Sequence, residues 1–298
     1  MSEKIVYKDL GEQLYIIKNP KSFEPKHIFE CGQCFRWNED ENGDYIGVIK
    51  DGVLKVKKQE NDILITGVLL DNTNIEDVCN RYFDLSNDYQ KIKLQLSRID
   101  DNLKNSINYG YGIRILKQDL WETIISFIIS ANNNIPRIKG IIERISKKYG
   151  KTIIWNNKEY YIFPSEEELS KATIQDLREL GLGFRDKRVY ETTKIISDNN
   201  GLIDEIENEK NTNVIREKLL NLPGVGPKVA DCIMLFALKK FDVFPIDVWV
   251  RRVMNDLYIK EKDEEKVNKK QIENLAREKY KNLAGLAQQY LFYWRREA

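Results

Sequence analysis

The most informative segment of this chain is Leu222-Pro-Gly-Val-Gly-Pro-Lys228, followed nineteen residues later by Asp247 in Phe244-Pro-Ile-Asp247. A glycine-rich loop of this kind leaves its backbone N–H groups accessible, so that they can point at an anion. Pro227 suits the first turn of a new helix, and the N-terminus of that helix also favours negative charge. We therefore expect a nucleic-acid phosphate to lie against Gly224, Val225 and Gly226, with Lys228 beside it.

The spacing of Lys228 and Asp247 allows the two side chains to face each other. Residues 227–239 predict a helix with one apolar face, and twelve or so residues span roughly 18 Å. Residues 241–246 can run back, because an extended chain covers up to about 3.3 Å per residue. Asp247 also precedes a second predicted helix, where an N-cap carboxylate is held ionised by the helix dipole. The alternative is a solvated lysine and a simple cap, but the adjacent hairpin favours a functional pair.

The composition is that of an ordinary globular protein, with 298 residues, 42% hydrophobic and 32% charged. This length predicts two domains, or one domain with a large appendage. The formal net charge is only +1, so nucleic-acid binding would need a local patch and backbone donors rather than bulk charge. No secretory apolar segment or membrane-length apolar run is present, which predicts a cytoplasmic protein, nucleoid-associated if prokaryotic, with no membrane partner.

The four cysteines are too few and too scattered for a disulfide scaffold. Cys31-Gly-Gln-Cys34 has the spacing of half a zinc or redox site, but the chain has one histidine, His27, and no second cysteine pair. The compact spacing of an iron–sulfur cluster is also absent. We therefore expect no metal or other cofactor, and two partly buried thiols on a strand.

Secondary-structure signals divide the chain into a β-rich and a helical part. Short apolar or alternating runs at 14–17, 35–37, 45–49, 53–56 and 63–65 are separated by the turn dipeptides Asn42-Gly43 and Asp51-Gly52. From about Ile75 to the end the period is helical, including an apolar helix over 120–130, a capping box at Ser165–Glu168 and a helix ending near Leu180. The prediction is an α+β protein: residues 1–100 form an antiparallel β-sheet domain with flanking helices, and residues 101–298 form a helical domain carrying the hairpin and the active site.

Five ordered segments resemble a known family. The hairpin ending in lysine, with Pro-x-Asp nineteen residues on, resembles the helix–hairpin–helix DNA glycosylase superfamily. The further segments resemble 8-oxoguanine DNA glycosylase from about residue 12 to the end: Gly32-Gln-Cys-Phe-Arg-Trp37, Asn132-Asn-Asn134 with Arg137, Gly181-Leu-Gly-Phe-Arg185, and Ala287-Gln288 with Phe292. The hairpin alone would be weak, because it also occurs in many noncatalytic DNA-binding proteins.

The resemblance implies a bifunctional glycosylase and AP lyase that acts on 8-oxoguanine opposite cytosine in double-stranded DNA. The nucleotide is extruded from the duplex, at a cost of a few kcal/mol. The residue matching the family's nucleophile is Lys228, which would attack the sugar C1′, expel the base and form a Schiff base before β-elimination. Asp247 would stabilise the positive charge that develops on the sugar.

The resemblance also implies the residues that read the base. The backbone carbonyl of Gly32 would accept the N7 proton that distinguishes 8-oxoguanine from guanine, a difference of about 1–3 kcal/mol. Phe292 and Cys232 would lie on opposite faces of the base, and Gln288 would read its Watson–Crick edge. The alternative for Phe292 and Cys232 is plain core packing.

On the opposite strand, the resemblance assigns Asn132 to the vacated space and Arg137 and Arg185 to the unpaired cytosine. Phe184 would wedge beside that cytosine. The alternative for Arg137 is a solvated helix position.

The sequence departs from the family's pattern at three positions. Trp249 replaces a histidine common in the family, and Arg295 replaces its acidic partner, which puts the expected phosphate contact in doubt; Trp249 or Arg251 could supply it instead. Phe184 lacks the hydroxyl of the usual tyrosine, so discrimination of the opposite base could be looser. We expect a monomer. The rival hypotheses are a glycosylase for another lesion and a noncatalytic DNA-binding protein that uses the hairpin alone.

Overall fold

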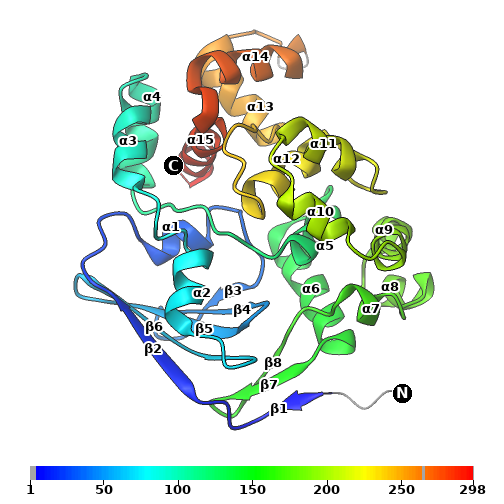
Figure 1. Ribbon diagram of the computed structural model, residues 1–298. Coiled ribbons are helices and arrows are strands. Elements are labelled where there is room, and N and C mark those ends of the chain that lie inside the picture. Colours follow the sequence, from blue (N-terminus) through cyan, green and yellow to red (C-terminus); the bar gives the residue numbers. More distant parts are fainter. Residues whose placement is uncertain (1–4, 264–265, 298) are drawn as a thin grey trace.

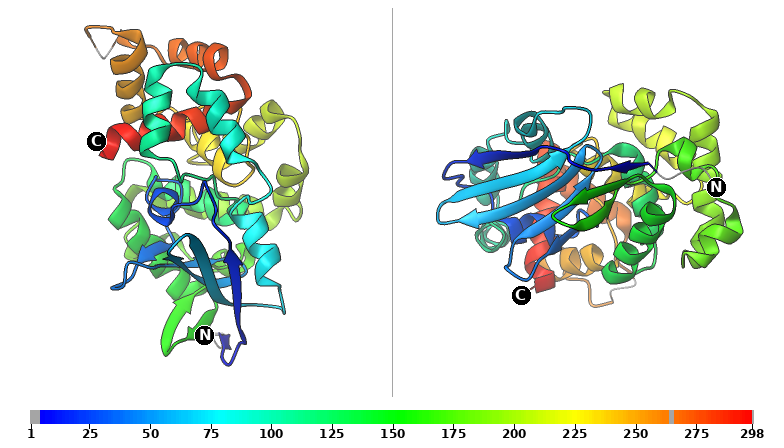
Figure 2. Two further views of the ribbon diagram at one scale, coloured as in Figure 1. Left: turned by 90° about the vertical axis from the view of Figure 1, so that its left-hand side faces the viewer. Right: turned by 90° about the horizontal axis from the view of Figure 1, so that it is seen from below.

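The computed structural model describes residues 5–263 and 266–297 and has the predicted α+β architecture (Figure 1). A five-stranded and a three-stranded β-sheet lie at one end of the molecule, and the remainder is mainly helical, as two further views also show (Figure 2). The strands are β1 Val6–Tyr7, β2 Glu12–Ile17, β3 Trp37–Glu39, β4 Tyr45–Ile49, β5 Gly52–Gln59, β6 Asp62–Leu69, β7 Thr152–Trp155 and β8 Lys158–Tyr161.

The main sheet has five antiparallel strands in the order β2-β6-β5-β4-β3. Its strands alternate between more and less buried positions, as in β4, because successive side chains point to opposite faces. Glycines occupy both predicted turns, with φ of 79° at Gly43 and 154° at Gly52. A Cβ on Gly52 would lie 2.2 Å from the carbonyl oxygen of Val68, so the turn needs glycine for space as well as for its backbone angle.

A second, three-stranded sheet in the order β1-β7-β8 corrects the prediction that the chain is helical throughout after Ile75. The β7–β8 hairpin turns at Asn156 and Asn157, whose φ angles of 51° and 59° are those of a type I′ turn. Ile153 and Trp155 pack against Val53 and Val68, and thus cover the outer face of the main sheet. The signal was present in the sequence as two β-branched and aromatic runs around an Asn-Asn pair.

The helices follow the predicted start and stop signals closely. The Ser165 capping box is formed, and the helix predicted over 120–130 has those bounds. The α-helices are α1 Pro25–Phe29, α2 Ile75–Tyr82, α3 Tyr89–Ser97, α4 Asp101–Tyr109, α5 Leu120–Ser130, α6 Ile135–Tyr149, α7 Glu166–Leu169, α8 Ile174–Glu179, α9 Asp186–Asp198, α10 Leu202–Asn208, α11 Thr212–Leu220, α12 Pro227–Phe236, α13 Val248–Met254, α14 Lys269–Tyr280 and α15 Ala284–Glu297. Shorter helical turns are η1 Gly183–Arg185, η2 Asn255–Ile259 and η4 Lys281–Leu283.

Two large hydrophobic clusters organise the molecule. One lies between the main sheet and helices α1 and α2, with Phe29 stacked on Trp37 at 4.0 Å between ring centroids. The other surrounds α5 and α12 and includes α3, through Tyr89 and Leu96. The domain boundary near residue 100 stays a prediction. No helix within the described part of the chain is long and apolar enough to cross a membrane.

Candidate active site

The helix–hairpin–helix is formed by α11, a turn over 221–226 and α12, which ends at Phe236, three residues before the predicted end. Gly224 has a φ of 88°, which L side chains rarely adopt. The carbonyl oxygen of Pro223 accepts a hydrogen bond from Thr192 Oγ1 at 2.8 Å, which fastens the turn to α9. Val225 is buried, so only its backbone is available to a ligand, whereas Gly226 has open space on its Cβ side.

Lys228 lies in the first turn of α12, directly after this hairpin. Its Nζ lies 5.6 Å from the centroid of the Phe127 ring of α5, a residue that was expected only in the core. One turn further along α12, Cys232 is buried. Burial raises the pKa of the Cys232 thiol to about 11, with Lys228 acting in the opposite direction. The cysteine therefore stays a neutral thiol near pH 7, and the lysine amine is the nucleophile that this site offers.

Asp247 is the N-cap of α13, as predicted: its carboxylate accepts a hydrogen bond from the backbone N–H of Val250 at 2.7 Å. Its negative charge also contributes to the raised pKa of Cys232, so Asp247 and Lys228 both act on the same thiol. Asp247 is thus within electrostatic range of the Cys232 thiol, one helical turn along α12 from Lys228. A fixed carboxylate at this place can stabilise a cation that forms beside Lys228.

The predicted base pocket is lined by Gly32, Phe292, Gln288 and Cys232. Gly32 has a φ of 84°, and a Cβ on it would lie 3.3 Å from Phe292 Cε1, so the loop and the α15 ring are in contact. Gln288 is buried on α15, and its Oε1 has no hydrogen-bond partner among the residues that the structure describes. A buried amide oxygen without a partner carries a free-energy cost, and a ligand that donates a hydrogen bond removes it.

The Gly32 loop is held by two buried glutamines rather than by strand pairing. Gln289 Nε2 donates to the carbonyl of Cys31 at 2.6 Å. Gln33 Nε2 donates to the carbonyls of Ile28 and Arg114, both at 2.8 Å. The prediction of two partly buried thiols on a strand was therefore wrong: Cys31 and Cys34 lie in the loop between α1 and β3 and are buried. Among the described residues, no group of three or more His, Cys, Asp or Glu side chains could hold a metal ion.

Arg185 and Asn132 meet at the predicted opposite-base site, but Arg185 is only 2% exposed. Its Nε and Nη2 donate to the carbonyl of Ala131 at 2.8 and 2.6 Å, and Nη2 also donates to the carbonyl of Asn132 at 2.6 Å. Asn132 itself is exposed with a φ of 50°. In this structure, then, Arg185 holds the backbone that presents Asn132; its predicted contact with cytosine stays a prediction.

Phe184 and Arg137 are on the surface beside Arg185. Phe184 is 57% exposed, with the Arg185 guanidinium 4.2 Å and the Arg188 guanidinium 5.7 Å from its ring centroid. Arg137 Nη2 donates to the carbonyl of Gly181 at 3.3 Å, which brings it to the same turn. An exposed aromatic ring backed by arginines suits insertion beside an unstacked base.

The structure also places the other two departures from the family's pattern, Trp249 and Arg295. Trp249 is 51% exposed on α13, with the Arg252 guanidinium 5.8 Å from its ring, and Arg251 is half-buried beside it. Arg295 forms an ion pair with Asp256 of η2. Arg295, at the position of the family's acidic residue, is therefore paired with the carboxylate of Asp256.

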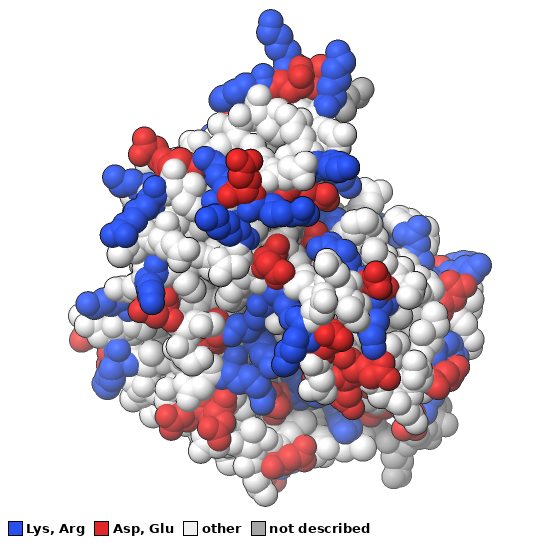
Figure 3. Space-filling view, turned by 45° about the horizontal axis from the view of Figure 1, so that its top comes forward, with Lys and Arg blue, Asp and Glu red and all other residues white. Residues whose placement is uncertain are grey.

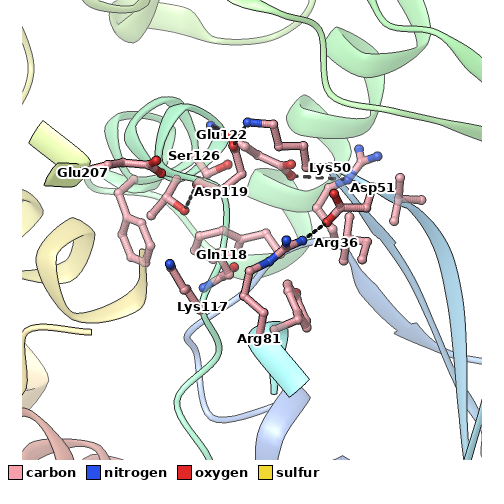
Figure 4. Close-up of a pocket in the computed structure, with 16 residues that line it drawn as sticks. Arg36, Lys50, Asp51, Arg81, Lys117, Gln118, Asp119, Glu122, Ser126 and Glu207 are labelled. Carbon is pink, nitrogen blue, oxygen red and sulfur yellow. Dashed lines mark hydrogen bonds and ion pairs between the residues drawn. The ribbon is translucent and has the colours of Figure 1, made fainter. Parts of the chain in front are cut away.

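A cleft between the sheet domain and α5 lies apart from these residues (Figure 4). It has a volume of about 250 Å³ and shares Phe127 with the Lys228 site. Its charged groups neutralise one another, as Lys50 does with Asp119 at 2.9 Å and Arg36 Nε with Glu122 at 3.6 Å. Lysine and arginine side chains also gather in a hollow near the middle of one face, so the net charge of +1 is unevenly distributed (Figure 3).

Two family models match consecutive parts of the chain. Residues 15–124 match the family described as the N-terminal domain of 8-oxoguanine DNA glycosylase, and residues 125–281 match the HhH-GPD superfamily of base excision DNA repair proteins.

Two curated relatives carry related names. The N-glycosylase/DNA lyase of Saccharomyces cerevisiae is 32% identical, over 76% of this chain and 66% of the yeast protein. The probable N-glycosylase/DNA lyase of Methanothermobacter thermautotrophicus is 33% identical, over 70% of this chain and 71% of that protein. Among solved structures, the Clostridium acetobutylicum 8-oxoguanine glycosylase/lyase, in complex with double-stranded DNA containing cytosine opposite 8-oxoguanine, is 43% identical. It superposes with a TM-score of 0.88 over 97% of this chain and 98% of that chain.

Proposed function

The chain belongs to the HhH-GPD superfamily of base excision DNA repair proteins and carries the N-terminal domain of 8-oxoguanine DNA glycosylases, and on this basis we propose that it excises 8-oxoguanine from duplex DNA. It acts as a bifunctional DNA glycosylase and AP lyase, as the names of its relatives indicate for those proteins. The observation that carries the residue assignment is that Lys228, directly after the hairpin, and Asp247, at the start of α13, both act electrostatically on the buried Cys232 thiol.

The chemistry begins with extrusion of the damaged nucleotide, because the sugar C1′ is shielded inside a duplex. The unprotonated amine of Lys228 attacks C1′, the C1′–N9 bond breaks, and the electron pair leaves with the base. Asp247 stabilises the positive charge on the sugar during this step. The covalent adduct opens to a Schiff base, and β-elimination then breaks the strand.

Base selection rests on a small number of contacts around Gly32. The carbonyl of Gly32 accepts the N7 proton of 8-oxoguanine, whereas guanine would present a lone pair to it, at a cost of about 1–3 kcal/mol. The extruded base stacks on Phe292 with the neutral Cys232 thiol on its other face. Gln288 reads the Watson–Crick edge, and its buried Oε1 supports this role.

The opposite strand is held by Phe184, Arg137 and the Asn132 loop. Phe184 inserts beside the cytosine, and Arg137 supplies a guanidinium fork for its edge. Hairpin residues Gly224–Gly226 bind a phosphate through backbone N–H groups, with Trp249 and Arg251 on the neighbouring helix as further backbone contacts. The partner is therefore double-stranded DNA, and we expect the protein to act on it as a cytoplasmic monomer.

Borohydride trapping tests the proposal directly, using a duplex with 8-oxoguanine opposite cytosine. Borohydride reduces a Schiff base to a stable amine, so the wild-type protein should give a covalent protein–DNA band. Lys228→Gln should lose the band and strand cleavage while keeping DNA binding. Lys171→Gln, a change at an exposed residue between α7 and α8, should keep both. Cleavage by Lys228→Gln at the wild-type rate would refute the assignment.

Two outcomes separate the rival hypotheses. Binding without base release by the wild-type protein would favour a noncatalytic DNA-binding protein. Release of alkylated or oxidised pyrimidine bases in preference to 8-oxoguanine would favour a glycosylase for another lesion.

A further inference from the structure

Arg296 lies at the end of α15, one helical turn after Phe292, and belongs to none of the sequence motifs named above. Its Nη2 donates a hydrogen bond to the carbonyl of Glu30, at the start of the Gly32 loop. Its Cζ lies 5.2 Å from the centroid of the Phe292 ring. The arginine therefore contacts both walls of the proposed base pocket.

The Arg296 guanidinium lies close to Gly32. A Cβ built on Gly32 would lie 3.2 Å from Arg296 Nη1 and 3.3 Å from Phe292 Cε1. Arg296 also acts electrostatically on the neighbouring Cys31 thiol, where it lowers a pKa that burial raises. A half-buried positive charge is thus fixed at the edge where the Gly32 loop meets the Phe292 ring.

We propose that Arg296 contacts the imidazole edge of the extruded base and stabilises the negative charge that this base acquires as it leaves. The inference rests on the proposed function. In the proposed complex the base stacks on Phe292, and its N7 faces the Gly32 carbonyl. C8 is bonded to N7, so C8 and its oxygen then lie on the side of the pocket that Arg296 occupies.

The charge balance of the step explains why a cation at this edge matters. Lys228 Nζ forms a bond to C1′ while the C1′–N9 bond breaks, and its electron pair goes to N9. In 8-oxoguanine that pair spreads over N9, C8 and the C8 oxygen. The proton released from the lysine nitrogen then neutralises the departed base. The guanidinium of Arg296 stays charged throughout the reaction. It stabilises the leaving anion more than it stabilises the neutral base, and this difference accelerates the breaking of the C1′–N9 bond.

The test compares two reactions that differ only in whether a base must leave. The first is single-turnover excision of 8-oxoguanine, and the second is strand breakage at a preformed abasic site. Arg296→Met keeps much of the side-chain volume without the charge, and Arg296→Lys keeps the charge. We expect Arg296→Met to slow excision at least about tenfold, a smaller loss than the roughly 100- to 1000-fold that follows removal of an oxyanion-hole donor.

Two matched changes and one stability measurement control this experiment. Arg296→Lys should recover a substantial part of the excision rate, and Arg277→Met, which removes an exposed arginine of α14, should excise at the wild-type rate. Breakage at the abasic site should be unchanged in Arg296→Met, because that step needs no departing base. The melting temperature should fall by no more than about 4 °C, since the hydrogen bond to the Glu30 carbonyl is lost.

Three results would overturn the inference. They are wild-type excision by Arg296→Met, an equal loss of excision in the Met and Lys variants, and a parallel loss of abasic-site breakage with a much larger drop in melting temperature than the loss of one hydrogen bond explains. Failure of the proposed function looks different: the wild-type protein itself would then form no trapped adduct on either 8-oxoguanine or abasic duplexes.

Discussion

At the residue scale, the environment of each side chain decides its chemistry. Cys232 provides a neutral apolar contact surface and is not a nucleophile, because burial raises the pKa of its thiol and keeps it protonated. Arg185 is the opposite case, a permanent charge inside the protein that is tolerated because backbone carbonyls surround it. Arg185 is buried and the neighbouring Arg137 is exposed, so their substitution should have different effects on stability and on recognition of the opposite base.

Arg185→Ala should lower the free energy of unfolding by on the order of 3 kcal/mol, because it leaves the carbonyls of Ala131, Leu182 and Asn132 without their buried donor. Thermal or urea unfolding measures this change. The same variant should also excise 8-oxoguanine more slowly, since Asn132 loses its support. A melting temperature equal to wild type would contradict the supporting role of Arg185.

Arg137→Ala should leave stability within about 0.5 kcal/mol of wild type, because the side chain is exposed. Its effect should appear in the preference for cytosine over the other three opposite bases, through loss of the guanidinium fork. Excision rates opposite all four bases provide the measurement. An equal slowing opposite every base would show that Arg137 does not read the opposite strand.

At the scale of elements, the helix–hairpin–helix uses its two glycines for different reasons. Gly224 needs its positive φ, and a Cβ on it would lie 3.0 Å from Ile128 Cγ2 and 3.1 Å from Arg188 Cβ. Gly226 has a φ of −93°. Apart from its chain neighbours, no described residue has an atom within 4 Å of the place that a Cβ would take, so the fold does not require glycine there. One glycine thus serves the fold, and the other leaves room for a ligand.

Gly224→Ala should destabilise the protein by roughly 1–2 kcal/mol, from left-handed strain and crowding against α5 and α9. Gly226→Ala should leave the melting temperature unchanged and weaken binding to duplex DNA, because a methyl group then stands where the phosphate backbone approaches. Thermal unfolding and a salt titration of DNA binding distinguish the two. Equal DNA affinity of Gly226→Ala and wild type would remove the hairpin from the phosphate contact.

At the scale of the whole molecule, the sheet domain and the helical domain meet across the charged cleft beside α5. Glu122 is central to this junction: burial raises its pKa from its ordinary value of 4.5 to about 7, although Arg36 acts to lower it. Because the folded state holds the proton more tightly than the unfolded state, ionisation of Glu122 opposes folding. Its contribution to stability is therefore fully present below the unfolded pKa and declines as the pH rises to about 7.

Glu122→Gln should remove this pH dependence. The melting temperature of the variant relative to wild type should rise between about pH 5 and pH 7 and then stay constant, since wild-type Glu122 is ionised above that range. Melting curves of both proteins across this range measure the difference. A difference independent of pH would show that Glu122 titrates normally and that the ion pair with Arg36 dominates.

Much of the fold, and the placement of Lys228 and Asp247 at helix N-termini, could be predicted because the signals are local in the sequence. The glycine hairpin, the caps at Ser165 and Asp247 and the apolar helix over 120–130 depend on residues within a few positions of one another. Local backbone preference and periodicity are enough to specify such features. The α+β architecture and the family's ordered segments follow from the same kind of signal.

Contacts between distant segments were decided only by the tertiary structure. Burial of Arg185 depends on carbonyls more than fifty positions away, and the loop of Cys31 is held by Gln289 from a separation of 258 residues. The β7–β8 hairpin packs on the main sheet through contacts with Val53 and Val68, which lie about one hundred positions earlier in the chain. Arg296 reaches Glu30 from 266 residues away. Side-chain packing and hydrogen bonds across such separations depend on where the chain places its elements, and no local pattern in the sequence encodes that placement.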